Sequence, residues 1–302
     1  MKRPLVLGTI VTTGLLAITV FGQQSPPAAP AAPQFPPIDT IEKVADNLYR
    51  ITGAGGSSAV LVRADGVLLV DTKVKDNGQA LLDQIKKVTD KPLTHIINTH
   101  THGDHTGSNS FFPAGVEVVV QENTKANMEK MPAFQSEADK VGLPDRTYKD
   151  RMTLFSGKEA VDLYYFGPAH TNGDSFVVFR NARVMHAGDV FARKAQPFID
   201  VSNGGSGLTF GDTIAKAAAG IKNVDKVITG HSDVMPWQDF VDFGEFNRLF
   251  LAHARASLAA GKSAEQALAE LKLPEKFSSY DLKNARGGPG GNFNVIYAEL
   301  RK

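Results

Sequence analysis

The most informative stretch of this sequence is residues 99–107, which read THTHGDHTG. The stretch places three histidines and one aspartate within six positions, directly after the apolar run Leu93 to Asn98. In extended backbone, residues two apart point the same way, so we expect His100 and His102 to converge on one cation. A single His-x-His pair is typically a surface pair, but the density of this motif predicts a metal site.

The second half of the motif follows a glycine. Gly103 is a flexible position at which we expect the chain to turn, directing Asp104 and His105 toward a second cation. Imidazole and carboxylate ligands suit zinc, and they also suit iron or manganese. The pattern therefore predicts metal binding without deciding which metal is bound.

Three more candidate ligands stand at the ends of later apolar runs. Such positions, followed by turn residues, are where loops gather around a site. They are His170 in the segment GPAHT, Asp189 in HAGD and His231 in TGHS.

Composition sets the class of the protein. The 302 residues are 42% hydrophobic and 22% charged, as in an ordinary globular chain with a full core. The sequence has no cysteine, which excludes disulfides and thiolate chemistry. No basic excess gathers in one region, so we expect a small-molecule substrate and no nucleic-acid partner. The oligomeric state stays open.

Residues 1–22 have the layout of a secretory signal peptide. Lys2 and Arg3 precede an apolar stretch, and Val20 and Gly22 are small enough for signal peptidase. An uncleaved anchor helix is the alternative, because the apolar stretch approaches the length of a membrane span. We expect cleavage, a periplasmic or secreted protein, and no stable membrane insertion afterwards.

Residues 23–37 hold six of the sixteen prolines and few large apolar side chains. This composition favours an extended tether, so we assign it as a Pro/Ala-rich linker. The folded domain is then expected to span residues 38–302.

Along that domain, strand and helix patterns alternate, which predicts an α/β fold of two similar halves. Helices are expected at 78–88, 123–131 and 212–221. Strands are expected at 47–51, 59–63, 67–70, 93–98, 116–120, 161–166, 175–179, 182–186 and 224–229. A stripe of phenylalanines from Phe240 to Phe250 indicates a core-facing helix ending at Gly261. Ser263 and Gln266 form a capping box for the next helix, through about Leu271.

From residue 41 to about 232 the sequence resembles the metallo-β-lactamase superfamily, with the histidine and aspartate motifs in the expected order. The resemblance implies a four-layer αββα sandwich with extra C-terminal helices and two Zn²⁺ ions per chain. It implies that three histidines, His100, His102 and His170, hold the first ion. Asp104, His105 and His231 would then hold the second, and Asp189 would bridge both.

The resemblance also assigns roles beside the ligands. Asp71, in the run Val70-Asp71-Thr72, matches the aspartate that organises the HxHxDH loop. Two neighbouring cations would share a bridging hydroxide at neutral pH, which attacks an amide, ester or thioester carbonyl. Asp104 is the candidate for orienting that hydroxide and moving its proton.

The substrate stays open among several classes. Lactamase subclasses with a cysteine ligand are excluded, whereas a β-lactamase with only His and Asp ligands is not. Gly188-Asp189 is more similar to thioesterases, lactonases and general hydrolases. The segment 197–200, together with Gly204-Gly205, resembles exported members of the superfamily whose substrate is unassigned. A non-haem iron persulfide dioxygenase is another member that uses these positions, and a structural metal module is the third class of function.

Three histidines remain outside the motifs. We expect His95, His186 and His253 to be structural, with His186 the nearest of them to the site.

Overall fold

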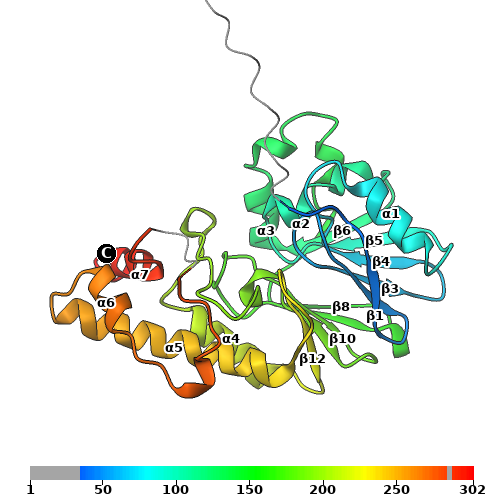
Figure 1. The fold of residues 1–302 in the computed structure, drawn as a ribbon. Helices are drawn as coiled ribbons and strands as arrows, with labels where there is room; N and C mark the ends of the chain where they lie inside the picture. Colours follow the sequence, from blue (N-terminus) through cyan, green and yellow to red (C-terminus); the bar gives the residue numbers. More distant parts are fainter. Residues whose placement is uncertain (1–34, 284–287) are drawn as a thin grey trace, which may run out of the picture. The chain divides into compact units, whose positions relative to one another are not determined.

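The computed structural model describes residues 35–283 and 288–302. The expected signal peptide and most of the linker lie outside these described residues. Within them, two mixed β-sheets are flanked by helices (Figure 1).

The first sheet has seven strands in the order of the chain. Strands β1 to β4 are antiparallel, and β4 to β7 are parallel. The strands are β1 (Ile41–Ala45), β2 (Leu48–Ile51), β3 (Ser58–Val62), β4 (Val67–Val70), β5 (Leu93–Ile97), β6 (Glu117–Gln121) and β7 (Arg146–Tyr148).

The second sheet has six strands, in the order β13-β12-β11-β10-β9-β8. Only the β11–β12 pair is parallel. The strands are β8 (Arg151–Leu154), β9 (Val161–Tyr164), β10 (Phe176–Phe179), β11 (Val184–His186), β12 (Lys226–Ile228) and β13 (Met235–Pro236).

Alternation along the strands shows how the layers stack. On β4, Leu68 and Val70 join the core between the two sheets, whereas Val67 and Leu69 face the helices. This pattern follows from the two-residue repeat of a strand that is buried on both faces. Three apolar cores therefore separate four layers, and the predicted αββα sandwich is confirmed.

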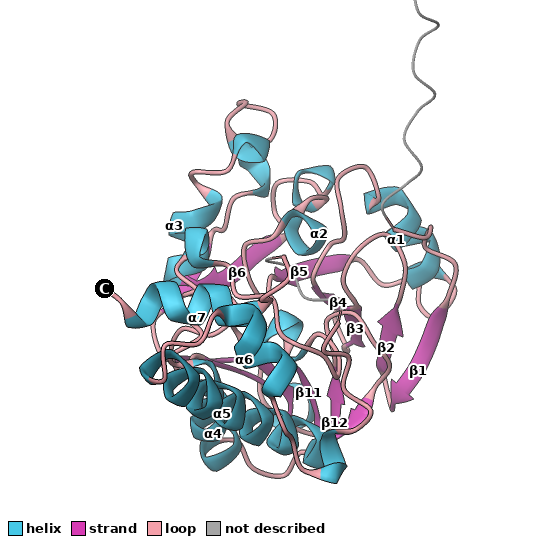
Figure 2. Cartoon of the chain, turned by 60° about the vertical axis from the view of Figure 1, so that its left-hand side comes forward, coloured by secondary structure: helices cyan, strands magenta, loops and turns pink. Residues whose placement is uncertain are grey.

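Helices cover the outer face of each sheet. α1 (Gly78–Lys86) and α3 (Glu122–Met128) contribute to the core of the first sheet. α4 (Phe210–Gly220) and α5 (Trp237–Ala259) pack side by side over the second (Figure 2). The expected phenylalanine stripe of α5 is buried in that core.

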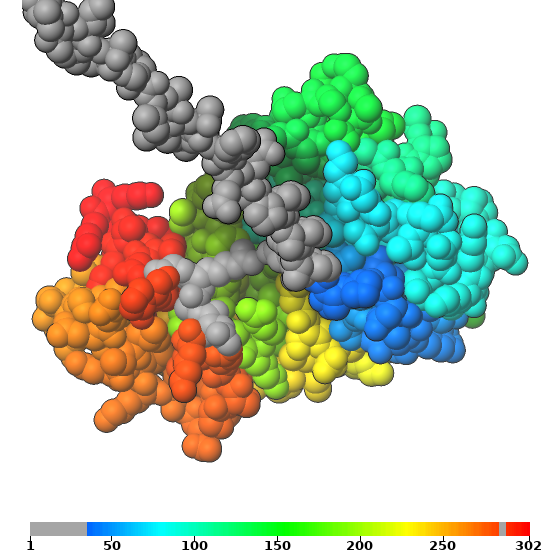
Figure 3. Space-filling view, turned by 45° about the horizontal axis from the view of Figure 1, so that its top comes forward, coloured from blue at the N-terminus to red at the C-terminus, as the bar shows by residue number. Residues whose placement is uncertain are grey.

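The predicted C-terminal helices are present. α6 (Ala264–Glu270) begins with the predicted capping box of Ser263 and Gln266, and α7 (Asn292–Leu300) follows. In the space-filling view the C-terminal residues, orange to red, gather on one side, and the first strands, blue, lie on the other (Figure 3). Within the described ranges, none of the helices combines the length and apolar character needed to span a bilayer.

The structure adds elements that the sequence patterns did not predict. Strands β1, β7, β8 and β13 are the main ones. The folded part also begins earlier than residue 38, because the backbone amide of Ala54 donates to the carbonyl of Pro36 at 2.6 Å. Residues 35–37 of the expected linker thus pack on the domain.

Candidate metal centre

All seven candidate ligands lie on connecting segments that follow strands, either in loops or in short helical turns. Residues 99–107 follow β5, and His170 stands between β9 and β10. Asp189 follows β11, and His231 follows β12. The two sheets thus direct residues far apart in the sequence to one edge of the sandwich.

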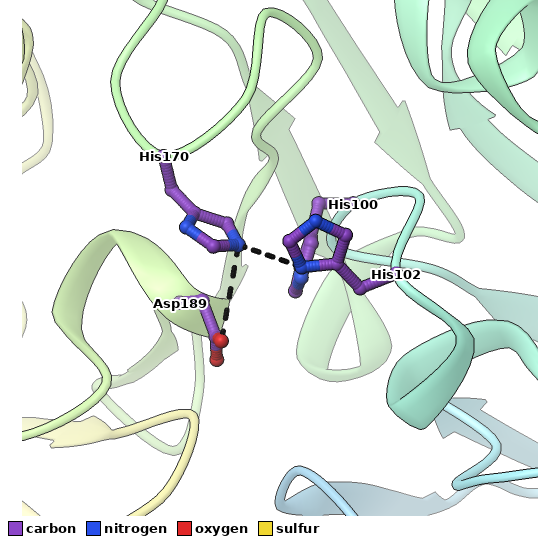
Figure 4. Close-up of side chains that lie close together, drawn as sticks. All are labelled: His100, His102, His170 and Asp189. Atoms are coloured by element: carbon purple, nitrogen blue, oxygen red, sulfur yellow. Dashed lines mark hydrogen bonds and ion pairs between the residues drawn. The ribbon is translucent and has the colours of Figure 1, made fainter. Parts of the chain in front are cut away.

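One group brings together His100, His102, His170 and Asp189 (Figure 4). One ligand atom from each of these residues lies within 4.8 Å of the others. Nε2 of His170 is 3.0 Å from Nδ1 of His102 and 3.8 Å from Oδ2 of Asp189. Three imidazoles and a carboxylate at such spacing are a donor set that suits zinc.

The second group consists of Asp104, His105 and His231, again with ligand atoms within 4.8 Å of one another. Nε2 of His231 is 3.2 Å from Oδ2 of Asp104. Asp189 also faces this group: its Oδ1 is 3.3 Å from Nε2 of His105, and its Oδ2 is 3.2 Å from Nε2 of His231. Asp189 therefore stands between the two groups, in the position that the family resemblance implied for a bridging carboxylate.

The turn between the two halves of the motif is built differently from our expectation. A short helix, α2 (Gly103–Thr106), begins after His102, whose own backbone is extended. A Cβ added at Gly103 would meet nothing within 4 Å, so this glycine is not required by a close contact. The helix turn, rather than glycine flexibility, directs Asp104 and His105 toward the second group.

Asp71 lies beneath the motif, fully buried. Its carboxylate accepts hydrogen bonds from the amide and hydroxyl of Thr99, each at 2.8 Å. It also accepts one from Nδ1 of His105 at 2.7 Å. This single side chain therefore fixes both the start of the motif and the orientation of His105.

Sequence reasoning missed the role of Asp200. Its Oδ2 lies 2.7 Å from Nε2 of His102, which leaves Nδ1 of that ring facing the first group. The same carboxylate accepts from Ser202 and Asn203. The only local signal was an aspartate that caps a short turn, and nothing in the sequence linked it to a histidine 98 positions earlier.

Three of the buried ligand atoms have no hydrogen-bond partner among the described residues. Nδ1 of His170 donates to the carbonyl of Phe198 at 2.7 Å, so its Nε2 carries the free electron pair. Nε2 of His100, Nε2 of His105 and Oδ1 of Asp189 are buried without a hydrogen-bond partner among the described residues. Orphaned buried polar atoms are costly. Since all three point into the two groups, the donor set fits bound metal ions.

The two groups differ in charge. Burial lowers the pKa of His100 well below its usual range and that of His170 to about 4, so both rings are neutral, as metal ligation requires. In the second group, burial opposes charge on His231. The carboxylates of Asp189 and Asp104 outweigh that effect and raise its pKa to about 9. The second group is thus a cluster of paired charges in the metal-free protein.

Comparison with known proteins agrees with this geometry. Residues 52–233 match the sequence model of the metallo-beta-lactamase superfamily, and this span is more than half of the chain. The chain belongs to the metallo-beta-lactamase superfamily. As a member, it is a metal-dependent hydrolase with candidate His/Asp metal-binding groups.

Relatives within the superfamily are distant. Metallo-beta-lactamase IND-1 of Chryseobacterium indologenes is 26% identical over 196 residues, which cover 62% of this chain and 78% of the relative. Metallo-beta-lactamase type 2 of Bacillus cereus is 24% identical over 178 residues, which cover 58% of this chain and 66% of the relative.

Solved structures of two metallo-beta-lactamases share the fold. The DIM-1 enzyme superposes with a TM-score of 0.58 at 18% identity. The enzyme from Pontibacter korlensis superposes with a TM-score of 0.59 at 17% identity. Each match covers 70% of this chain and 99% of the other. At such identity the likeness establishes the fold alone.

In this superfamily member, a glycine-rich loop after β2 packs closely against the second group. The amide of Gly56 donates to the carbonyl of Asp104 at 3.1 Å, and a Cβ at Gly56 would overlap the His105 imidazole. The fully buried Lys73 donates to the carbonyls of Ile51 and Gly56 and holds the loop from behind.

Three non-glycine residues in or beside this loop have a strained backbone conformation. Ala54, Asp71 and Lys73 all have positive φ, at 49°, 62° and 69°. Non-glycine residues adopt this conformation only when the surrounding structure enforces it, and such residues cluster at functional sites.

The three remaining histidines have structural partners. His186 is buried behind the second group, and both of its ring nitrogens bond to backbone, Nε2 to the carbonyl of Ser57 and Nδ1 to the amide of Gly188. His253 faces the carbonyl of Ala267 at 2.8 Å. His95 lies 3.3 Å from Glu117 on the neighbouring strand.

A cavity of about 130 Å³ opens onto both groups. Part of its wall is aromatic, and the exposed Arg193 side chain stands on it with no hydrogen bond or ion pair to the other described residues. The lining residues are Phe35, His102, Asp104, Asp189, Ala192, Arg193, Gln196, Pro197, Phe198, His231 and Phe243.

Proposed function

We propose that this chain is a zinc-dependent hydrolase with two Zn²⁺ ions that opens an amide, ester or thioester carbonyl. The observation that carries the proposal is the set of orphaned buried atoms on His100, His105 and Asp189. They face one another across two groups of ligands that adjoin an open cavity. Without a metal ion, Nε2 of His100 would remain buried with no partner among the described residues, whereas Nε2 of His105 and Oδ1 of Asp189 would be compensated in part by the ion pair between them at 3.3 Å.

Each residue would have a distinct part in this function. His100, His102 and His170 would hold the first ion, Asp104, His105 and His231 the second, and Asp189 both. When bound, zinc polarises a carbonyl and lowers the pKa of water.

Asp104 is the proposed catalytic side chain. It lines the cavity beside His231, and its pKa is lowered to about 2. Burial opposes that shift, but the neighbouring His105 and His231 outweigh it. The carboxylate is therefore ionised at neutral pH and available to orient the attacking water and accept its proton.

A β-lactamase is the second candidate, supported by the similarity to the metallo-beta-lactamases of Chryseobacterium indologenes and Bacillus cereus. Lactam, lactone and thioester substrates all present a carbonyl of the kind proposed. The exposed guanidinium of Arg193 on the cavity wall favours substrates with an anionic group.

The test is a substrate panel on protein loaded separately with zinc, iron or manganese. We expect the zinc form to hydrolyse at least one of a chromogenic cephalosporin, a lactone and an acyl thioester, and the Asp189→Ala variant to lose that turnover. An iron form that consumes oxygen with glutathione persulfide, beside an inactive zinc form, would contradict the proposal and favour a dioxygenase.

We also propose that the protein is exported and matures near Gln23. Support comes from the sequence of residues 1–22 alone, with its basic start, apolar stretch and small residues before the cleavage point. N-terminal sequencing of protein recovered from the periplasm or medium tests this. Full-length chain in washed membranes would contradict it.

A further inference from the structure

We propose that Phe35, with Phe198, forms an aromatic wall that selects substrates with a flat apolar group next to the reacting carbonyl. Phe35 belongs to the segment that composition assigned to the linker, and it lies outside the residues matched by the superfamily. The proposal rests on the proposed function and names the substrate class of that site. It makes Phe35 a specificity-determining residue.

The two rings flank the two ligand groups. The Phe35 ring stacks on His231 of the second group, with ring centroids 6.3 Å apart and an angle of 17° between planes. The Phe198 ring stacks on His102 of the first group, at 5.6 Å and 26°. Both phenylalanines line the same cavity. An apolar group seated there would contact aromatic faces while its carbonyl reached the ligand groups.

Phe35 is held in place by its neighbours in the chain. The amide of Ala54 donates to the carbonyl of Pro36, and the carbonyl of Ala54 accepts from Val74 at 3.0 Å. Gly53 has a φ of +88°, and a Cβ there would overlap the carbonyl of Pro37. The close approach therefore needs glycine. The adjacent Pro36 and Pro37 also restrict the backbone.

The segment before Phe198 is fixed from the C-terminal side. The Gln196 side chain donates to the carbonyl of Leu282 at 2.6 Å and accepts from the amide of Asn292 at 3.1 Å. The Asn292 side chain donates to the carbonyl of Pro197 at 2.6 Å. Both parts of the aromatic wall are thus braced by contacts beyond the ligand loops. Such preorganisation lowers the entropic cost of binding.

Paired hydroxamates test this inference by binding rather than turnover. Acetohydroxamate and phenylacetohydroxamate present the same metal-chelating group, and only the second has a phenyl arm. Calorimetry on zinc-loaded protein gives the ratio of their dissociation constants. We expect wild type to prefer the phenyl compound, and Phe35→Ala to reduce that preference by roughly three- to tenfold, the usual size of an aromatic contact.

Matched control variants distinguish the effect of losing the Phe35 ring from general damage to the protein. Phe111→Ala removes a phenylalanine that is 45% exposed and outside the cavity lining, so its ratio should equal that of wild type. Protein starting at Gln34 should retain the preference, and protein starting at Ile38 should lose it. Phe35→Leu, which keeps an apolar side chain, should retain part of it.

The outcomes distinguish the two proposals. If both hydroxamates bind and the ratio is unchanged in Phe35→Ala and in the chain starting at Ile38, the role of Phe35 is overturned and the metal site stands. If neither hydroxamate binds the zinc-loaded wild type, the proposed function is overturned and the role of Phe35 with it.

Discussion

Replacing Asp200 by asparagine would test how the first ligand group is held. Asp200 contacts His102 through the nitrogen that faces away from the group, at 2.7 Å. Both carboxylate oxygens accept from donors, one from His102 and Asn203 and the other from the amide and hydroxyl of Ser202. An asparagine amide would therefore set an NH₂ group against donors in either orientation.

We expect the Asp200→Asn substitution to change which ring nitrogen of His102 carries the proton. With an NH₂ opposite it, Nε2 of His102 is favoured as an acceptor, which moves the proton to Nδ1. That is the nitrogen within 3.0 Å of Nε2 of His170 in the first group. Loss of a carboxylate behind a ligating histidine typically costs 10- to 100-fold in metal affinity. This equals roughly 1.4–2.7 kcal/mol of binding free energy.

Competition with a chromophoric zinc chelator measures this effect for each site. We expect Asp200→Asn to weaken one of two zinc-binding events by about 10- to 100-fold. Asp225→Asn removes an aspartate paired with Arg183 on the surface, so it serves as the matched control with wild-type affinities. Wild-type affinity at both sites in Asp200→Asn would refute the positioning argument.

Three further predictions concern the second group and its support. Asp104→Asn should lower kcat by roughly 10²-fold with both metals retained, which requires bound metal to be measured on the assayed sample. Near wild-type kcat would exclude a role for Asp104 in proton transfer. Gly56→Ala should push on the His105 ring and weaken the second zinc by about tenfold, while the first binds normally in the same chelator titration. Burial, partly offset by Asp71, lowers the pKa of Lys73 from 10.5 to about 7. The unfolded chain therefore holds the extra proton between these pH values. The unfolding free energy of metal-free protein should rise with pH in that window, by up to about 1.4 kcal/mol per unit more than in Lys73→Met. Urea unfolding at pH 7, 8 and 9 checks this, and parallel slopes in the two proteins would contradict it.

The α/β class was predictable because strand and helix patterns alternate along the chain, whereas the four-layer sandwich was implied by the family resemblance. Buried runs such as Val67 to Val70 show strand length and apolar character directly. Exposed edge strands do not show these features: two of the three residues of β7 are exposed, and so are two of the four residues of β8. Their pairing is set by neighbouring strands rather than by local sequence, so these elements were missed.

The candidate ligands were predictable because their types are concentrated at strand ends. The structure brings His100, His102, His170 and Asp189 into one group, as the family resemblance implied. Asp200 had no such signal, because its contact with His102 exists only once the chain is folded.

Phe35 was missed for a compositional reason. Its proline-rich neighbours indicated a tether, yet the same prolines stiffen the short segment that lies on Gly53. The prediction for Gly103 was wrong for the opposite reason. We expected a turn that needs a flexible residue, but the segment forms an ordinary helical turn that does not require glycine.

Metal content of purified protein tests the central claim most directly. Elemental analysis after zinc loading and gel filtration should give two zinc ions per chain. His170→Ala and His231→Ala should each retain about one, because they belong to different groups. Wild-type protein with one zinc or none, or loss of both ions from either single variant without unfolding, would contradict two separate sites joined by Asp189.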